Sequence, residues 1–398
     1  MNIIKKSWNK INLDELIEYE QPTKYIVKST EYSNDYNIPV LTAGKSFLLG
    51  YTNEKESIFN HLPVIIFDDF TTATKFVNFP FKVKSSAMKI LKPRNNSVNV
   101  KFVFYYMQTI QLKNDTHKRY WISEYSKLLI PNPSLEVQNL IVSKIEQLFS
   151  ELENGKQQLE TALQQLKIYR QSLLKWAFEG KLTNKNVKEG ELQEGWKSMK
   201  LRDVCDKIQD GSHFSPKVQY FEPGENRFMY ITAKNIRNNY MDLKKIIYTN
   251  KEFHDSIFER CNPEYGDVLL TKDGVNTGEV TINTLHEQFS LLSSVCLFKT
   301  NKTELEGKYL KYYIQSPLGS KLINNSMTGT AIKRIILRKI KEAEIILPTM
   351  DEQNLIVDEL ESKLTICDKM EETIVNSLQQ AESLRQSILK KAFEGKLK

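Results

Sequence analysis

The sequence lacks several features that mark particular classes of protein. It contains 4 cysteines among 398 residues, and no two of them form a CxxC pair, so neither a disulfide framework nor a zinc knuckle is indicated. Its apolar runs are a few residues long, far short of the roughly 20 that a membrane helix needs. The first residues turn polar at Lys5 and Lys6, without the apolar core of a signal peptide. We therefore expect a cytoplasmic protein with reduced thiols.

Motifs for catalysis are also scarce. Residues 43–46 have the sequence of the end of a phosphate-binding loop, but Pro39 stands where that loop needs its first glycine. The five histidines are far apart and form no HExxH pattern. Asp68 and Asp69 with Lys75 have the composition of a nuclease site, although their spacing is generic. With no methyltransferase motif either, we expect no catalytic residue and no metal or cofactor bound by this chain.

Positive charge is unevenly distributed along the chain. The net charge is +7, and the excess lies in residues 1–132 and 183–347, which also hold most of the aromatic residues. A basic surface with aromatic and amide side chains suits a polyanion such as nucleic acid, because cations that neutralise phosphates release counterions. A merely basic globular domain is the alternative that charge alone leaves open.

An internal repeat organises the chain. Residues 133–182 align with residues 348–397 at a constant offset of 215 without a gap, and 21 of the 50 positions are identical. The longest identical stretch is Ala177–Leu182 against Ala392–Leu397. Identity this long, in register with two further blocks, indicates a duplication.

Both copies have the pattern of a long helix. In the first copy, apolar or small side chains recur at alternating steps of four and three residues from Leu148 to Trp176, which is the a/d stripe of a coiled coil; the stripe of the second copy is weaker. Gly180 and Gly395 stand where a C-cap glycine belongs. About 40 helical residues span roughly 60 Å. Since a small domain cannot bury a stripe of that length, we expect the two copies to pack against each other.

The segments before the two helices are weakly related. Tyr105–Gln108 resembles Tyr312–Gln315, and β-branched and aromatic runs broken by turn residues lie around these landmarks. We predict an α+β protein with a pseudo-two-fold internal repeat, in which two mixed α/β domains alternate with two helical spacers. The predicted boundaries are 1–132 for the first domain, 133–182 for the first spacer, 183–347 for the second domain and 348–398 for the second spacer.

The residues at both ends of the repeated helix resemble a known family, the specificity subunits of type I restriction-modification enzymes. The resemblance covers the whole chain, and its most specific parts are Pro348–Gln353, Ile356-Val357 and Leu384–Leu397. The first copy departs from the second where Val137 replaces Glu352 and Trp176 replaces Lys391, so local contacts there are expected to differ. In the second domain, the segments Asp210–His213 and Tyr230–Ile236 are similar to ones frequent in the family's target recognition domains.

The resemblance implies a DNA sequence-specificity subunit without catalysis of its own, part of a type I restriction endonuclease and adenine DNA methyltransferase complex. In such systems the two helices pack antiparallel, each target recognition domain reads one half of a bipartite double-stranded DNA site, and helix length fixes the unread spacer. Two methyltransferase (modification) subunits, which bind S-adenosylmethionine, and ATP-dependent restriction subunits join the scaffold. The resemblance therefore places S-adenosylmethionine, ATP and Mg²⁺ in partner subunits.

Candidate DNA contacts are chosen from basic and amide residues in expected loops, because Arg and Asn can pair with base edges and Lys more often meets phosphate. A solvated surface charge is the alternative for each residue alone. Equivalent places in the two domains favour the Lys-Arg pairs at 118–119 and 333–334. The candidates are Lys24, Lys28, Lys45, Arg94, Lys118 and Arg119 in the first domain, and Lys217, Lys234, Asn235, Arg237, Asn276, Lys333 and Arg334 in the second.

The end of the repeated helix is the candidate for partner binding. Docking of a methyltransferase and simple packing of the helix end against a domain are equally compatible with its sequence. The candidate residues are Lys175, Phe178, Glu179, Lys390, Phe393 and Glu394.

Two other functions stay open from the sequence. One is a structural coiled-coil adaptor whose globular domains bind proteins, which the basic, aromatic-rich domains disfavour. The other is an autonomous nuclease, which the lack of a metal-ligand constellation disfavours.

Overall fold

The computed structural model describes most of the chain. The described residues are 8–42, 46–110, 119–184, 186–188, 193–329 and 334–397.

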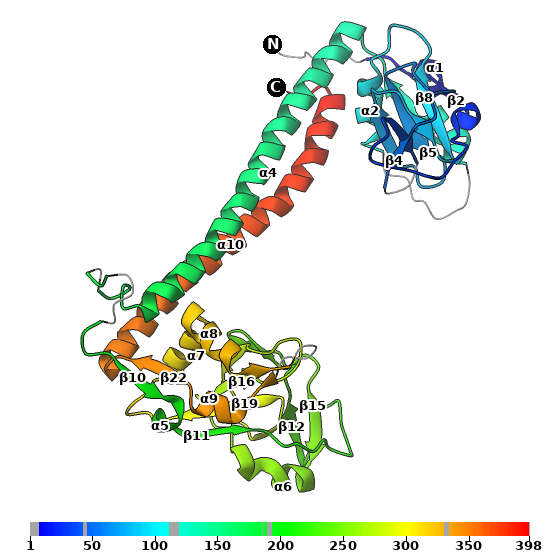
Figure 1. Cartoon of the computed structure of the whole chain (residues 1–398). Coiled ribbons are helices and arrows are strands. Elements are labelled where there is room, and N and C mark those ends of the chain that lie inside the picture. Colours follow the sequence, from blue (N-terminus) through cyan, green and yellow to red (C-terminus); the bar gives the residue numbers. More distant parts are fainter. Residues whose placement is uncertain are drawn as a thin grey trace. The chain divides into compact units, whose positions relative to one another are not determined.

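The chain forms two compact units, and both long helices contribute to each (Figure 1). Unit 1 consists of residues 1–160 and 375–398, and unit 2 of residues 161–374. The helices are α4 (Leu135–Phe178) and α10 (Met350–Phe393), of 44 residues each. Below, head 1 denotes residues 8–132 of unit 1, and head 2 denotes residues 193–347 of unit 2.

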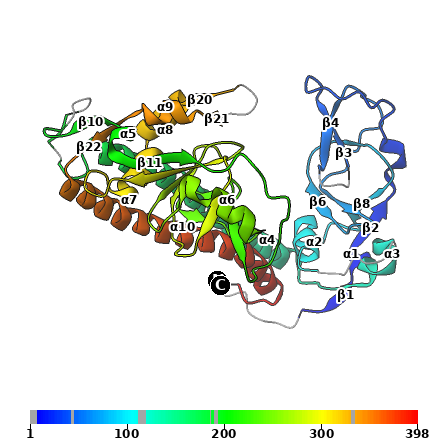
Figure 2. The same ribbon diagram turned by 90° about the horizontal axis from the view of Figure 1, so that it is seen from below.

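Head 1 contains two small sheets. The first is antiparallel with the strand order β2-β8-β5-β6, and the second has the order β4-β3-β7 with β3 and β7 parallel. Figure 2 shows β3 and β4 at one end of the head and α1, α2 and α3 at the other. The elements are β1 (Lys10–Asn12), α1 (Leu13–Leu16), β2 (Ile17–Glu20), η1 (Pro22–Tyr25), β3 (Ile38–Leu41), β4 (Leu48–Thr52), β5 (Val64–Asp68), β6 (Thr74–Val77), β7 (Lys82–Val83), β8 (Met88–Pro93), α2 (Val100–Met107), α3 (Tyr120–Ser123), η2 (Tyr125–Lys127) and β9 (Leu129–Pro131).

Head 2 repeats this topology. Its sheets have the orders β11-β19-β16-β17 and β15-β12-β18, again with one parallel pair in the smaller sheet, and β10 pairs with β22 as β1 pairs with β9. The elements are β10 (Lys197–Lys200), α5 (Leu201–Val204), β11 (Cys205–Asp210), β12 (Arg227–Ile231), β13 (Ile236–Arg237), β14 (Tyr240–Met241), β15 (Ile247–Asn250), α6 (Lys251–Cys261), β16 (Val268–Thr271), β17 (Val280–Ile282), β18 (Phe289–Leu291), β19 (Val295–Thr300), α7 (Gly307–Gln315), α8 (Pro317–Asn325), β20 (Met327–Thr328), β21 (Arg334–Ile335), α9 (Leu337–Lys341) and β22 (Glu344–Leu347).

The interior strand of each larger sheet anchors its head. Every residue of β5 and of β16 is buried, as expected for short β-branched and leucine-rich runs with neighbours on both sides. Because the interior strands and the sheet orders correspond, the duplication seen in the helices extends through both heads. The predicted mixed α/β architecture is thus confirmed.

The two long helices pack antiparallel. In unit 1 the first half of α4 shares an apolar cluster with the last part of α10, which includes Ile145 and Leu389. In unit 2 the last part of α4 packs with the first half of α10, and Arg170 Nη2 lies 2.7 Å from Asp368 and 2.9 Å from Glu371. The start of each helix therefore meets the end of the other.

The buried stripe of α4 departs from the predicted heptad pattern near the end of the helix. Tyr169 and Trp176 are 43% and 39% exposed, whereas Leu174 and Ala177 are 5% and 0% exposed. An α-helix drifts by about 20° per heptad relative to a 3.5-residue repeat, so its buried face rotates along its length. Here the rotated face packs on the core of head 2.

Both helices end as the sequence predicts. Two residues after the last helical residue, Gly180 and Gly395 adopt φ values of +81° and +67°. This left-handed conformation favours glycine and stops the helix. Among the described residues, no helix is both long enough and apolar enough to cross a membrane. All four cysteines are free and buried.

A buried glutamine joins each head to the helix that follows it. In unit 1, Gln138 Oε1 accepts the Asn99 amide at 2.8 Å, and its Nε2 donates to the Pro133 carbonyl at 3.0 Å. In unit 2, Gln353 Oε1 accepts the Glu306 amide at 2.9 Å, and its Nε2 donates to the Pro348 carbonyl at 3.2 Å. We call these two arrangements the glutamine clasps. Each clasp holds the residue that caps the helix α2 or α7, because Asn99 and Glu306 are those N-caps.

The head helix that is clasped by the start of one long helix is also packed by the end of the other long helix. Phe393 of α10 contacts the rings of Phe102 and Tyr106 on α2, with centroids 5.1 and 5.2 Å away. Phe178 of α4 contacts Tyr309 and Tyr313 on α7 at the same two distances. Ion pairs repeat as well, Lys101 with Glu146 in unit 1 and Lys308 with Glu361 in unit 2. Each head is therefore fixed to the start of one helix and the end of the other.

Candidate nucleic-acid interface

One end of head 2 joins loops that are far apart in the sequence. The amides of Ala233 and Lys272 donate to Ser294, to its Oγ at 3.1 Å and to its carbonyl at 2.7 Å. The Ile335 amide in turn donates to the Lys272 carbonyl at 3.0 Å. Three segments are thereby held around the turn between β18 and β19, and their exposed side chains form one surface.

A buried acid holds this surface together. Asp210 Oδ2 accepts Lys272 Nζ at 2.6 Å, and Asp210 Oδ1 accepts Arg260 Nη2 at 2.7 Å. Asp210 and Lys272 are 4% and 6% exposed. His213 Nε2 lies 3.6 Å from the same carboxylate. Gly211 follows Asp210 because a Cβ there would lie 2.2 Å from the Leu291 carbonyl oxygen.

The charge state of Asp210 follows from these contacts. Burial by itself would raise the pKa of Asp210, but hydrogen bonds from Lys272 and Arg260 outweigh burial and hold the pKa below its usual value. The carboxylate is therefore ionised at neutral pH and neutralises two cations that stand beside the loops. This network positions the loops, and Arg260 Nε also donates to the Asp210 and Gly211 carbonyls at 2.9 and 3.0 Å.

The hairpin that follows the interior strand has the same base in both heads. In head 1 the Asp68 amide donates to the Ala73 carbonyl, and in head 2 the Thr271 amide donates to the Glu279 carbonyl, both at 2.8 Å. The residue after each of these donors, Asp69 or Lys272, accepts a further hydrogen bond at its carbonyl. The donor is the Tyr120 amide in head 1 and the Ile335 amide in head 2, both at 3.0 Å. Arg119 and Arg334 precede these two donors, which makes them structurally equivalent.

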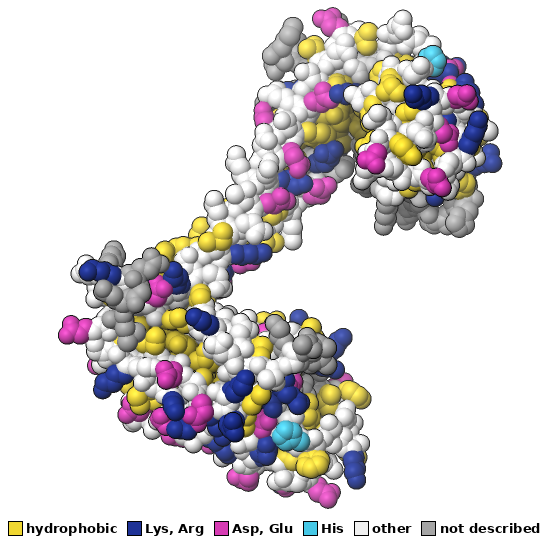
Figure 3. Space-filling view, in the orientation of Figure 1, with side chains coloured by type: hydrophobic (Ala, Val, Ile, Leu, Met, Phe, Trp, Pro, Cys, Tyr) yellow, Lys and Arg dark blue, Asp and Glu magenta, His cyan; other side chains and the backbone are white. Residues whose placement is uncertain are grey.

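Four candidates in head 2 are accessible to solvent. Lys217 and Lys234 are exposed, Asn276 is partly exposed in the hairpin loop, and the side chain of Arg334 is 62% exposed. Arg334 Nε donates to Asp273 Oδ1 at 2.6 Å, so its guanidinium is oriented beside the hairpin. Lysine and arginine side chains gather on the visible face of unit 2 between acidic and apolar ones (Figure 3).

Two candidates in head 2 are occupied by contacts within the protein. Asn235 is 5% exposed; its Oδ1 accepts the Thr232 amide at 3.0 Å and its Nδ2 donates to the Asp242 carbonyl at 3.0 Å. It therefore shapes a turn and does not face solvent. Arg237 is partly buried, with its Nη1 3.7 Å from Glu279.

In head 1, Lys24 and Arg94 belong to one ionic network along β2 and β8. Lys24 lies 2.8 Å from Glu20, and Arg94 lies 3.5 Å from Glu18. Burial would raise the pKa of Glu20, but hydrogen bonds from Lys24 and its neighbours lower it to about 2. Both cations therefore already have acidic partners, as Arg334 has in Asp273.

The remaining candidates in head 1 are spread out. Lys28 is exposed, with its Nζ 3.8 Å from Glu56, and Arg119 is exposed at the N-cap of α3. Lys45, Lys118 and Lys333 lie outside the described residues.

The candidate partner residues occupy equivalent places at the two helix ends. Phe178 is 1% exposed and Phe393 is partly buried, each packed on head tyrosines as described above. Around them, Lys175 pairs with Glu179 at 3.7 Å, and Glu394 pairs with Lys396 at 2.7 Å. Lys390 is exposed and lines a pocket of about 450 Å³ with Phe393 and Glu394. The charged members are thus the accessible part of each helix end.

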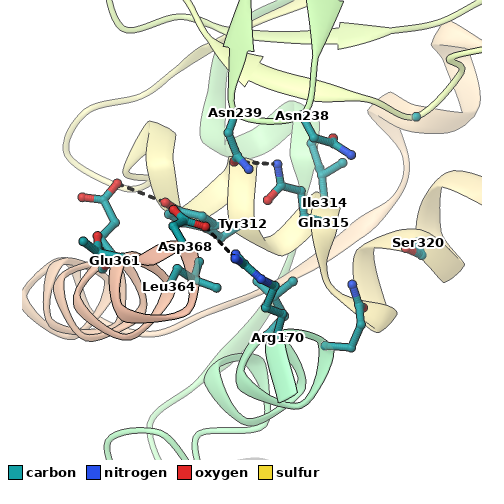
Figure 4. A pocket seen from close by; sticks show the side chains of 14 residues that line it. Arg170, Asn238, Asn239, Tyr312, Ile314, Gln315, Ser320, Glu361, Leu364 and Asp368 are labelled. Carbon is teal, nitrogen blue, oxygen red and sulfur yellow. Dashed lines mark hydrogen bonds and ion pairs between the residues drawn. The ribbon is translucent and has the colours of Figure 1, made fainter. Parts of the chain in front are cut away.

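A polar pocket of about 620 Å³ lies within unit 2 where head 2 meets the helices (Figure 4). Arg170 points from α4 toward Asp368 of α10, and Gln315 Nε2 of α7 donates to Asn239 Oδ1 at 3.0 Å. These internal contacts satisfy the polar side chains that face one another, so the pocket is best explained as the junction between head and helices.

Sequence reasoning missed the residues that organise the loops. Arg260 lies on α6, 50 positions from its partner Asp210, and no motif links the two. Lys272 directly follows a buried strand, and nothing in the sequence at that place indicates an ion pair. Asp68 and Asp69, weighed as nuclease acids, are buried, and Asp68 Oδ1 accepts the Phe70 amide of its own hairpin at 2.9 Å. Within the described residues, no group of three or more His, Cys, Asp or Glu side chains is placed to hold a metal.

Comparison with known proteins agrees with this architecture. The family described as "Type I restriction modification DNA specificity domain" matches residues 5–161 and 193–380. The chain is 38% identical over 242 residues to the specificity subunit of the Escherichia coli type I restriction enzyme EcoR124I/EcoR124II, a match that covers 58% of this chain and 56% of that subunit. It is 24% identical over 419 residues to the EcoBI specificity subunit of Escherichia coli, covering 99% of this chain and 87% of the relative.

Solved structures share the fold. The HsdS subunit from Thermoanaerobacter tengcongensis superposes with a TM-score of 0.64 at 18% identity, covering 99% of this chain and 98% of that one. A chain from a structure of complex assembly and conformational transition in a type I R-M system gives a TM-score of 0.69 at 17% identity, covering 99% of both. The resemblance in the helix ends, the duplicated heads and these matches lead to one conclusion: the chain belongs to the family of type I restriction-modification DNA specificity subunits.

Proposed function

We propose that this chain reads a bipartite DNA site on behalf of a type I restriction-modification enzyme and has no catalytic role itself. Head 1 reads one half of the site and head 2 the other, while α4 and α10 set the unread spacer and dock two methyltransferase subunits. S-adenosylmethionine, ATP and Mg²⁺ act in the methyltransferase and restriction subunits. The chain works in the cytoplasm, where the assembled enzyme meets DNA.

The observation that carries this proposal is the repeated attachment of each head to both helices. A clasp glutamine, a Lys–Glu pair and a phenylalanine occur at corresponding places in unit 1 and unit 2. Such contacts restrict rotation of a head on its helices. Two linked readers gain effective concentration only when their spacing fits both halves of the target, so a firm attachment favours a divided site.

The loop end of head 2 has the chemistry for double-stranded DNA. Exposed Lys217 and Lys234 suit phosphates, and Arg334 is held by Asp273 beside the hairpin, where it can reach a base edge. A buried network fixes these loops before binding, so less conformational entropy is lost on the DNA.

The main test is to map methylation by the complete complex. The chain is co-expressed with a type I methyltransferase subunit, and methylated adenines are located by sequencing. We expect a motif of two defined halves separated by a fixed number of unspecified base pairs. An adaptor that binds proteins through its heads would give no motif and no gel shift with the methyltransferase present, which would contradict the proposal.

Helix length tests the spacer. One heptad is inserted after Gln158 and one after Thr373, equivalent positions at the offset of 215. Each insertion adds about 10 Å of helix, which corresponds to about three base pairs of DNA. We expect a motif with unchanged halves and a longer spacer, and a matched control with one insertion alone to lose methylation because the helices no longer pair. An unchanged spacer would refute the ruler role.

Arg334→Ala tests the DNA surface. We expect weaker specific binding by the assembled enzyme and a smaller dependence of affinity on salt. Arg202→Ala is the matched control, because Arg202 is also half-exposed and ion-paired, with Asp203 at 3.4 Å, but lies on α5. Equal affinities and salt slopes for both variants would remove Arg334 from the interface.

Docking and packing at the helix ends can be separated by charge. Lys175→Glu with Lys390→Glu changes the accessible charges while Phe178 and Phe393 keep their packing. We expect loss of co-purification with the methyltransferase and an unchanged helical signal in circular dichroism. Retained co-purification would leave these helix ends with a packing role alone.

A further inference from the structure

Each head carries an exposed apolar side chain at the tip of the same hairpin. Phe70 follows β5 in head 1 and is 50% exposed, and Val275 follows β16 in head 2 and is 105% exposed. Single exposed apolar residues are common on protein surfaces. Phe70 and Val275 differ from such isolated residues because they lie on equivalent hairpins. The hydrogen bonds at the base of the two hairpins correspond, and so do the neighbouring arginines, Arg119 and Arg334.

Both tips are held rigidly. In head 1, Asp68 Oδ1 accepts the amides of Phe70 and Thr71 at 2.9 and 3.2 Å, and Thr72 adopts a φ of +61°. In head 2, Thr277 Oγ1 donates to the Gly274 carbonyl at 2.6 Å, and the Glu279 amide donates to the Asn276 carbonyl at 3.0 Å. A local hydrogen-bond network thus holds each tip, and the apolar side chain on it stays exposed to solvent.

We propose that these two tips insert among the bases, so that Phe70 and Val275 determine specificity in their respective half sites. The inference rests on the proposed DNA-reading function. An apolar side chain can contact the methyl group of thymine in the major groove, or enter a base step and unstack it. In head 2 the oriented guanidinium of Arg334 stands beside the tip and supplies the polar contact that an apolar group cannot make. The different tip residues and loop lengths would give the two heads different targets on one framework.

The test uses the complete complex with its methyltransferase and a duplex that contains the mapped site. Affinities are measured for Phe70→Ala and Val275→Ala on a series of duplexes, each with one base pair changed. We expect Val275→Ala to bind the intact site about tenfold more weakly and to lose discrimination at one or two positions of one half site. Phe70→Ala should do the same in the other half site.

Matched controls lie at the opposite ends of the same elements. Phe79, 38% exposed, follows β6 away from the tip, and Tyr265, 57% exposed, precedes β16. Phe79→Ala and Tyr265→Ala should bind and discriminate as the unmodified chain does. Val275→Thr keeps the branched shape on a fully exposed residue, so a loss of discrimination in this variant cannot come from misfolding.

The outcomes separate this inference from the function on which it rests. If the unmodified complex yields no bipartite motif, the proposed function fails. If the motif exists and both tip variants keep its affinity and base preferences, the tip inference alone is overturned. It is also overturned if the variants lose affinity equally on every duplex, because a contact without sequence dependence does not determine specificity.

Discussion

The junctions of the two heads with the helices are built alike, whereas their loop ends differ. At the junctions, Gln138 corresponds to Gln353 and Phe393 to Phe178, with hydrogen bonds and ring distances that agree within about 0.2 Å. At the loop ends, α6, the β13–β14 hairpin and the Asp210 network of head 2 have no counterpart among the described residues of head 1. A scaffold constrains the residues that meet both helices and leaves the loops beyond them free to vary.

One asymmetry within the junctions lies at the start of each long helix. Glu352 accepts hydrogen bonds from Trp196 Nε1 at 3.0 Å and Gln193 Nε2 at 2.8 Å. Its counterpart Val137 packs against the apolar cluster of unit 1. The sequence shows that Val137 stands where the second copy has Glu352, but it does not show the contacts that each residue makes. The same helix start can thus be held by polar contacts in one unit and by apolar ones in the other.

The largest expected effect tests the helix ends. Phe178 is 1% exposed and its counterpart Phe393 is partly exposed, so the cost of truncation should differ. Phe178→Ala should lower the free energy of unfolding by about 3–5 kcal/mol and Phe393→Ala by less, because a more exposed ring leaves a smaller cavity. Urea denaturation of the full chain measures both. Equal losses would show that the two ends are energetically alike.

A smaller effect tests whether the clasps are equivalent. Gln138→Ala and Gln353→Ala each leave a buried amide and carbonyls without their partners, and we expect a loss of about 2–3 kcal/mol in each case. Hydrogen exchange at α2 for the first variant and α7 for the second reports the local opening. The exposed Glu136 and Asp351, two residues before each glutamine, give control variants. A loss of stability for only one of the two variants would show that the two clasps are not equivalent.

Replacement of Glu352, whose counterpart in unit 1 is Val137, should lower the free energy of unfolding by less than loss of a clasp. Glu352→Val leaves the buried indole N–H of Trp196 unpaired, and we expect a loss of about 1–2 kcal/mol in the free energy of unfolding. Glu352→Gln, which keeps an acceptor oxygen, is the control. If Glu352→Val is as stable as the control, the apolar solution of unit 1 would serve equally well in unit 2.

The smallest effect concerns pH. Burial raises the pKa of Glu306, the N-cap of α7, whereas the corresponding cap in head 1 is the neutral Asn99. A raised pKa means that the stability contributed by Glu306 is fully present below the usual pKa near 4.5 and is lost as pH rises through the higher folded-state value. As pH rises from 4 to 7, the unmodified chain should therefore lose stability that Glu306→Asn does not lose. Urea denaturation at each pH measures the difference between the two. A pH-independent difference would contradict this assignment.

Much of the fold followed from the sequence, for identifiable reasons. The repeat at an offset of 215 reveals the two helices, and Gly180 and Gly395 mark their ends, because periodicity and capping are local properties. The heptad pattern failed at Tyr169 and Trp176, since which face of α4 is buried there depends on the core of head 2. The candidate site was harder to foresee, as Asn235 shows: an asparagine in a loop can hold a turn as well as face DNA.

The sequence by itself determined the duplication, the helical spacers, the mixed heads and the family, because each rests on patterns along the chain. Only the tertiary structure decided how Gln138 and Gln353 clasp the head helices, how Arg260 and Lys272 meet at Asp210, and which cations stay exposed at the loops. Those contacts join residues from about 40 to more than 60 positions apart. They depend on burial and hydrogen-bond geometry in three dimensions, which periodicity and spacing along the chain do not encode.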